Sequence, residues 1–228
     1  MFDLTLEQVD QDGALLDTVE GAFGRSRAEF LSKALVTGGV LLGALALPRR
    51  ARSQEDDMSI LNFDLAFEYL QATFYTEAEQ LGTVDAMTAE QALWARTLGS
   101  HERAHVKIIK SVLGKAAVKR PAFNFGGATD TPESFTKTAV AMEDLTVSLL
   151  VGQADRFQSP DLVAALFTLI TTEARHAAWA RRIEGFTPIG KAFDDPMTLA
   201  QVDKVVATTN FVDSKLKTVA EGDPRFTG

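Results

Sequence analysis

Ser100-His101-Glu102-Arg103-Ala104-His105 and a second stretch, Thr172-Glu173-Ala174-Arg175-His176, carry the pattern that decides the fold. Each contains Glu-x-x-His, and two residues three apart on an α-helix lie on the same face, about one turn from each other. The chain has 3 histidines, and all of them lie in these two stretches. This concentration of a scarce residue predicts a functional cluster.

Two further glutamates, each in an apolar segment, extend the pattern to four helices. Glu68 and Glu102 have their sequence midpoint at residue 85, inside a predicted turn. Glu143 and Glu173 have theirs at residue 158, beside a second predicted turn. If both pairs of helices fold back antiparallel, each pair of glutamates lies level across its own hairpin. The spacing therefore predicts that four carboxylates and two imidazoles meet inside a helical bundle.

The order Glu…Glu-x-x-His…Glu…Glu-x-x-His across residues 58–183 resembles the ferritin-like superfamily of di-iron and di-manganese carboxylate proteins. The resemblance implies a pair of metal ions, iron or manganese, at a site that would also accept zinc. The implied metal ligands are Glu68, Glu102, His105, Glu143, Glu173 and His176. It implies Glu102 and Glu173 as bridging ligands and one histidine for each metal. Glu68 and Glu143 are implied as terminal or bridging ligands.

Within that superfamily, Leu-Asn-Phe-Asp-Leu-Ala-Phe-Glu-Tyr-Leu at residues 61–70 is similar to a bacterial ferritin-like domain related to plant desiccation-related proteins. The resemblance implies iron(II) oxidation or peroxide removal in stress protection, with metal ions and oxygen species as partners. A non-enzymatic metal-binding or structural protein of the desiccation-related type stays open as an alternative. The pattern does not decide whether a substrate is turned over.

His101-Glu102-Arg103-Ala104-His105 also matches His-Glu-x-x-His, the zinc-protease helix in which two histidines bind zinc and the glutamate is the base. That alternative leaves Glu68 and Glu143 unexplained, and the chain shows no strand that could hold a peptide substrate. Under the ferritin-like interpretation, His101 points about 100° away from Glu102 around the helix. We then expect His101 on the surface or beside the site.

Each glutamate taken alone has a more ordinary interpretation, on a solvated face or in a core salt bridge with an arginine. The candidate partners are Arg96, Arg103, Arg156 and Arg175. Tyr75 follows Glu68 by two turns on the same face, and we expect a core tyrosine hydrogen-bonded to the bundle. A redox-active role for Tyr75 stays open.

Helical periodicity predicts five helices, at residues 58–81, 89–114, 132–157, 160–183 and 199–213. Their starts carry N-cap patterns at Thr88, Thr131, Ser159 and Thr198. Residues 53–57 are expected to be a polar linker and residues 115–131 a long connection. The chain should therefore form an all-α, ferritin-like four-helix bundle over residues 54–228, with a long crossover between the second and third helices and a short C-terminal helix.

The N-terminal region divides into an acidic extension at residues 1–24 and a signal-like leader at residues 25–53. The uncharged run at residues 34–47 is shorter than the ~20 residues of a membrane-spanning helix. Ser-Arg-Ala-Glu-Phe-Leu-Ser-Lys at residues 26–33 is similar to a twin-arginine export signal, with Ala28 in place of the second arginine. We expect export to the periplasm or cell envelope. An uncleaved anchor and a cytoplasmic protein are the alternatives.

The composition of the chain excludes several classes of function and of binding site. The net charge of −8 argues against nucleic-acid binding as the main task. The chain has no cysteine, which excludes disulfides, thiolate zinc sites and cysteine-ligated iron–sulfur clusters. The leader and the long connection are not typical of a cage-forming storage subunit. Membrane contact is expected only through an uncleaved leader, and a homo-oligomer stays open.

Overall fold

A computed structural model of the chain describes residues 54–212. The predicted acidic extension and leader, residues 1–53, lie outside the described residues. Five α-helices make up most of the described range: α4 (Gln54–Gln80), α5 (Ala89–Leu113), α6 (Pro132–Gln153), α7 (Pro160–Ile183) and α8 (Leu199–Thr209). Two short 3-10 helices, η1 (Val84–Ala86) and η2 (Gly114–Ala116), lie at the two ends of α5. None of the described helices has the length and hydropathy needed to cross a membrane.

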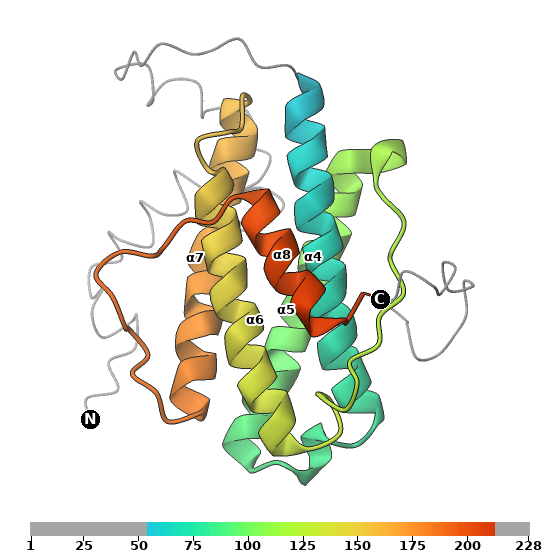
Figure 1. The fold of residues 1–228 in the computed structure, drawn as a ribbon, viewed down its shortest axis with the longest axis vertical. Helices are drawn as coiled ribbons and strands as arrows, with labels where there is room; N and C mark the ends of the chain where they lie inside the picture. The colour runs from blue at the N-terminus through green and yellow to red at the C-terminus, as the bar shows by residue number, and fades with distance from the viewer. Residues whose placement is uncertain (1–53, 213–228) are drawn as a thin grey trace, which may run out of the picture.

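The four long helices form a bundle built from two antiparallel hairpins (Figure 1). α4 pairs with α5, α6 pairs with α7, and the hairpins meet through α4 against α6 and α5 against α7. The connection after α5 runs along the bundle to its opposite end, so that α6 is parallel to α5. The described residues contain one isolated β-bridge and no strand. The predicted all-α four-helix bundle, with its long crossover and short C-terminal helix, is confirmed.

The helix starts follow the capping chemistry of the sequence. The Thr88 and Thr198 hydroxyls each accept the backbone N–H three residues on, from Gln91 and Gln201 respectively. The same contact is made at the starts of α6 and α7, where a proline also occupies the first turn. These caps fix where each helix begins, because an N-cap side chain satisfies an amide that the helix itself leaves without a partner.

The prediction of a polar linker at residues 53–57 is wrong over residues 54–57, because α4 begins at Gln54; residue 53 lies outside the described residues. Asp57 explains the difference. Its buried carboxylate accepts the backbone N–H groups of Gln158, at 2.8 Å, and Ser159, at 3.0 Å, in the turn between α6 and α7. A residue that is polar in sequence thus holds the start of one hairpin against the turn of the other.

Two predicted helix ends also fall too late. α6 ends at Gln153 rather than residue 157, and tighter turn bonds follow, such as Arg156 N–H to the Gln153 carbonyl at 2.9 Å. α8 ends at Thr209 rather than residue 213, because Asn210 adopts the left-handed conformation with φ of 56°. Neither difference moves a candidate site residue.

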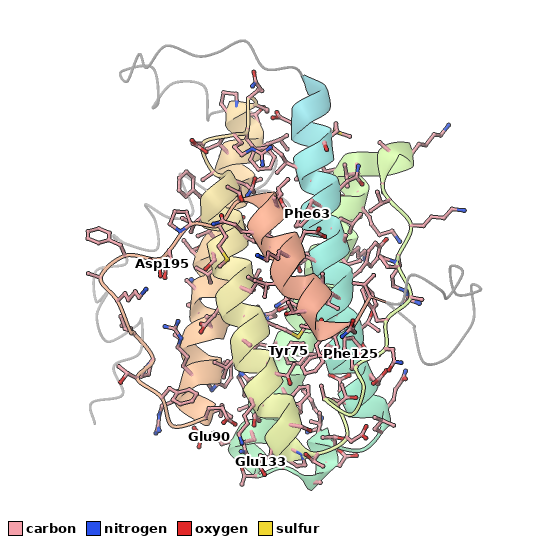
Figure 2. All side chains as sticks on the ribbon, viewed as in Figure 1. Phe63, Tyr75, Glu90, Phe125, Glu133 and Asp195 are labelled. Carbon is pink, nitrogen blue, oxygen red and sulfur yellow. The ribbon has the colours of Figure 1, made fainter. Side chains whose placement is uncertain are left out.

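An aromatic cluster fills the bundle at the end near the α4–α5 turn. Phe74 stacks on Phe135 with ring centroids 4.8 Å apart, and Trp94 meets the edge of Tyr75 at 6.2 Å. Phe125, from the long connection, packs against Phe74 at 5.3 Å, and Figure 2 shows it on the same side as Tyr75. Phe74, Tyr75, Trp94 and Phe135 are fully buried. The long connection therefore contributes Phe125 to the core, next to the Phe74 ring that packs against Tyr75.

The C-terminal helix α8 is attached to α6 through Met197. The Met197 N–H donates to the Ser148 carbonyl at 2.9 Å, and the Met197 carbonyl accepts from the Gln153 amide at 3.1 Å. Gly152 makes this approach sterically feasible, since a Cβ there would overlap the Met197 backbone.

Gly152→Ala should destabilise the protein by about 1–3 kcal/mol, because the added methyl group must displace the Met197 backbone. Urea denaturation followed by circular dichroism measures the change. Gly190→Ala is the control, since a Cβ there meets only the end of the Arg181 side chain at 3.4 Å. Equal stability of the two variants would show that Met197 does not need the close approach.

Candidate metal centre

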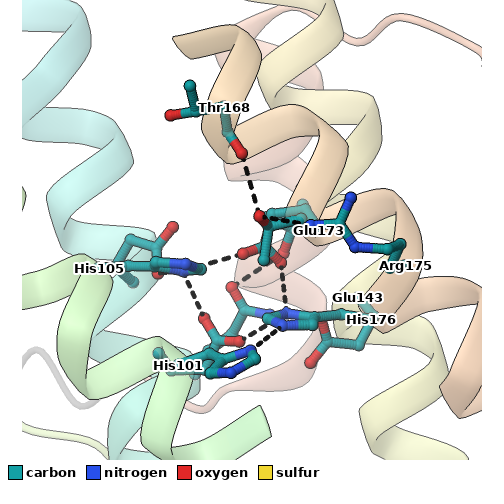
Figure 3. A network of polar contacts seen from close by, with 12 residues as sticks. His101, His105, Glu143, Thr168, Glu173, Arg175 and His176 are labelled. Carbon is teal, nitrogen blue, oxygen red and sulfur yellow. Dashed lines mark hydrogen bonds and ion pairs between the residues drawn. The ribbon is translucent and has the colours of Figure 1, made fainter. Parts of the chain in front are cut away.

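Four helices bring all six candidate residues to one place in the bundle interior (Figure 3). α4 supplies one glutamate, α6 supplies another, and α5 and α7 each supply a glutamate and a histidine. The residues are Glu68, Glu102, His105, Glu143, Glu173 and His176. The four glutamates are at most 1% exposed. The convergence expected from the level hairpins is what the structure shows.

The six side chains fall into two overlapping groups of four. The first, here called the His105 subsite, consists of Glu68, Glu102, His105 and Glu173. The second, the His176 subsite, consists of Glu102, Glu143, Glu173 and His176. Within each group, one ligand-type atom per residue lies within 4.8 Å of the others. Glu102 and Glu173 belong to both groups, as bridging ligands would, and each group has its own histidine.

Both histidines face the carboxylates with Nδ1. His105 Nδ1 lies 2.9 Å from Glu173 Oε1 and 3.4 Å from Oε2 of both Glu68 and Glu102. His176 Nδ1 lies 3.0 Å from Glu102 Oε1 and 3.2 Å from Glu173 Oε2. Nε2 of each ring therefore points away from the cluster.

The contacts within the cluster are close, but few of them are hydrogen bonds. Six buried atoms of the cluster have no hydrogen-bond partner: Glu68 Oε2, both oxygens of Glu102, His105 Nδ1, Glu143 Oε2 and Glu173 Oε1. A buried polar atom without a partner costs about 1–3 kcal/mol, and more when it is charged. Oxygen and nitrogen lone pairs that converge in this way fit metal ions.

Burial and mutual repulsion shift the acid–base behaviour of the metal-free cluster. Burial raises the pKa of Glu68 and of Glu143 well above the usual range, and the charges of Glu102 and Glu173 add to it. Burial also acts to raise the pKa of Glu102, but the two neighbouring imidazoles outweigh it and lower that pKa to about 2. Burial would lower the pKa of His176, yet the carboxylates around it raise it to about 10. In the metal-free cluster, protons on the imidazoles and on Glu68 and Glu143 thus offset the negative charge of the carboxylates.

The salt-bridge alternative does not describe these glutamates. Arg103 pairs with Glu79 at 3.3 Å, and both side chains are partly exposed. The other three arginines considered as partners contact Asp85 (Arg96), Gln153 (Arg156) and Thr172 (Arg175). Among the described residues, no arginine forms an ion pair with a glutamate of the cluster.

His101 stands outside both groups. Its Nδ1 lies 2.8 Å from Nε2 of His176, on the side of that ring that faces away from the carboxylates. A zinc-protease site would need His101 and His105 to converge on one metal. The expectation that His101 lies beside the site is met, and its specific neighbour is a histidine of the opposite hairpin.

Tyr75 is fully buried and donates its hydroxyl to Glu143 Oε1 at 2.6 Å. The expected core tyrosine is thus bonded to a carboxylate of the cluster rather than to the backbone. Burial, followed by the charge of Glu143, raises the Tyr75 pKa well above its usual value. The hydroxyl therefore stays a donor and leaves Glu143 Oε2 directed at the His176 subsite.

Comparison with known protein families identifies one match. The model of the family described as "Ferritin-like domain" matches residues 56–185, which is more than half of the chain and includes all six clustered residues. No curated protein matches the chain.

Asp64 is a buried carboxylate outside the Glu…Glu-x-x-His pattern. Asp64, Glu68, Gln71 and Tyr75 follow one another at helical spacing and are each at most 2% exposed, so they form one interior stripe of α4. Neither oxygen of Asp64 has a hydrogen-bond partner. Burial raises its pKa from 3.8 to about 7, although the charge of Arg156 opposes the shift. The helical spacing from Glu68 was the signal that could have identified it.

Asp64→Asn should remove a pH-dependent cost of folding. Because the native state holds a proton on Asp64 that the unfolded chain has already released, the contribution of Asp64 to wild-type stability falls as pH rises from about 4 to about 7. Relative to wild type, the metal-free variant should gain up to roughly 4 kcal/mol over that interval and no more above it. Urea denaturation at a series of pH values measures the difference.

The control for the loss of one negative charge is Asp155→Asn, at an exposed carboxylate next to Arg156. Parallel stability curves for wild type and Asp64→Asn from pH 4 to pH 7 would contradict a buried, proton-holding Asp64.

Proposed function

The chain belongs to the ferritin-like domain family, and on that premise we propose that its buried cluster holds two metal ions, iron or manganese, and that the protein is a di-metal oxidoreductase. Its reaction would be iron(II) oxidation or peroxide removal. The observation that carries the proposal is the set of buried ligand atoms without hydrogen-bond partners, arranged in two groups that share Glu102 and Glu173. In a solely structural core, such atoms would only destabilise the fold.

The ligand chemistry supports the choice of metals. Four carboxylates with two imidazoles suit iron and manganese, and neither thiolate nor thioether is present in the two groups. Glu102 and Glu173 would bridge the two ions, Glu68 and Glu143 would each bind one, and each ion would take one histidine through Nδ1. Zinc fits the same atoms but has no redox chemistry.

A bound pair of redox metals would supply two electrons to reduce dioxygen to hydrogen peroxide, or hydrogen peroxide to two waters, with uptake of two protons. Two further iron(II) ions, or a second hydrogen peroxide oxidised to dioxygen with release of two protons, would return the two electrons. The protein's own groups shape the site for small molecules. Tyr75 holds Glu143 through its 2.6 Å hydrogen bond. The His105 side chain is 14% exposed and that of His176 is 4% exposed, so the His105 subsite is the nearer of the two to solvent. Oxygen species would reach the metals from that side.

A role in stress protection is the biological context that we propose. The likeness of residues 61–70 to a bacterial domain related to plant desiccation-related proteins supports it. Removal of peroxide, or of the iron(II) that reacts with peroxide, would protect a cell under oxidative or desiccation stress.

Single glutamate substitutions should separate shared from unshared ligands. Glu102→Gln or Glu173→Gln should weaken binding of both metal ions, because each side chain belongs to both groups. Glu68→Gln should weaken the binding of one ion and Glu143→Gln the binding of the other, each by about 10-fold or more in affinity. Calorimetric titration of the metal-free protein with Co²⁺ measures the two events.

Glu133→Gln, at an exposed glutamate paired with Lys137, is the control and should leave both events unchanged. If Glu102→Gln weakened only one ion, the bridging arrangement would be wrong. Wild-type protein that binds fewer than two ions would exclude the di-metal centre.

Turnover separates an enzyme from a protein that only binds metal. The wild-type protein should accelerate aerobic iron(II) oxidation, or peroxide decay after loading with iron or manganese. Glu173→Gln should abolish the acceleration, because Glu173 belongs to both groups of ligands and its loss weakens the binding of both redox ions. Absorbance of iron(III) and the concentration of peroxide are the measurements. Two bound ions without turnover would leave a metal-binding bundle and end the oxidoreductase proposal.

A further inference from the structure

The contact between His101 and His176 joins the two hairpins outside the cluster. His101 Nδ1 lies 2.8 Å from His176 Nε2, and the two rings are nearly parallel, with centroids 5.0 Å apart and planes 24° apart. His101 comes from α5 and His176 from α7, and Figure 3 shows the two rings facing each other. The residue that follows His101 is Glu102, which is shared by both subsites. One turn of α5 thus contacts both the inner and the outer side of the His176 ring.

The two nitrogens of His176 have different roles. Nδ1 lies 3.0 Å from Glu102 Oε1 and is directed into the cluster. If Nδ1 gives its lone pair to a metal, the neutral ring carries its hydrogen on Nε2. That N–H then donates to Nδ1 of His101, which must present a lone pair. The contact fixes both the tautomer and the rotation of the His176 ring.

His105 has no such support among the described residues. Its Nδ1 faces the cluster in the same way, at 2.9 Å from Glu173 Oε1. No hydrogen bond joins its Nε2 to another described residue, and its side chain is 14% exposed, against 4% for His176. The two subsites therefore have equivalent ligands but different surroundings.

We propose that His101 is a positioning residue for the His176 subsite, holding the His176 ring in its metal-binding tautomer and making that subsite the tighter of the two. The inference rests on the proposed function, since it concerns the same pair of metal ions. A hydrogen-bond acceptor behind a ligating imidazole raises the basicity of the ligand and limits its rotation. The His176 subsite fills first, and the His105 subsite exchanges its ion with solvent more readily.

The test is a set of substitutions at residue 101, each titrated with Co²⁺ by calorimetry. His101→Ala removes the acceptor and should weaken one of the two binding events by about 10–100-fold. His101→Asn keeps an amide oxygen near the position of Nδ1 and should stay within about 3-fold of wild type. His101→Gln carries its oxygen one bond further out and should resemble His101→Ala. Ser100→Ala, at the exposed neighbour in sequence, is the matched control.

A double variant identifies which ion is affected. In the Glu143→Gln background, in which the His176 subsite is already weakened, His101→Ala should have little further effect on the remaining tight event. A full additional loss there would place the effect of His101 at the His105 subsite and overturn the inference. Circular dichroism checks that each variant is folded. If His101→Ala does not fold, the comparison of His101→Asn with His101→Gln decides, and equal affinities overturn the inference.

The outcomes distinguish this inference from the proposed function. Wild-type protein that fails to bind two Co²⁺ ions would end both. Wild-type protein that binds two ions, with His101→Ala binding both at unchanged affinity, would end the role of His101 and leave the di-metal centre intact.

Discussion

Four carboxylates share one interior volume of the bundle, and the rest of the molecule has to accommodate their charge. Fully ionised, Glu68, Glu102, Glu143 and Glu173 carry four negative charges, and burial makes each of them far more costly than in water. Two protonated imidazoles balance only half of that charge, which is why burial and repulsion keep the pKa values of Glu68 and Glu143 high. Two divalent cations with neutral imidazoles would bring the sum to zero. The charge of the cluster, like its geometry, is thus consistent with two metal ions.

The fold meets this requirement through helix register. Each helix carries one glutamate of the cluster, and the two turns place those glutamates level, so that a shift of one residue in either hairpin would rotate a ligand out of the core by about 100°. Several contacts fix the register away from the cluster. Asp57 binds the α6–α7 turn at one end, and the stacked rings of Phe74 and Phe135 fill the other. Met197 fastens α8 across α6 beside Gly152.

The sequence predicted the parts of this arrangement that depend on spacing along one helix. Glu102 and His105 could be placed on one face because the helical period is fixed, and Thr88 could be recognised as a cap from local chemistry. Contacts between helices were not accessible in the same way. In sequence, Asp57 resembles a linker residue, because its partner Gln158 belongs to the other hairpin. The contact of His101 with His176 depends on how α7 is rotated about its own axis. Asp64 lay on a periodic stripe, but its burial depends on what packs against α4.

The two halves of the cluster have equivalent ligands but differ in the residues that surround them. Between α4 and α6 the interior is closed, and Tyr75 and the Gln71–Thr146 pair, at 2.9 Å, fill it with hydrogen-bonded groups. On the other side of the cluster the His105 side chain is 14% exposed, against 4% for His176. A symmetric set of ligands is therefore held in asymmetric surroundings. In a low-dielectric interior, the hydrogen-bonded groups on the closed side hold charge and geometry fixed. The surroundings of the two histidines, more than the identity of the ligands, therefore distinguish the two subsites.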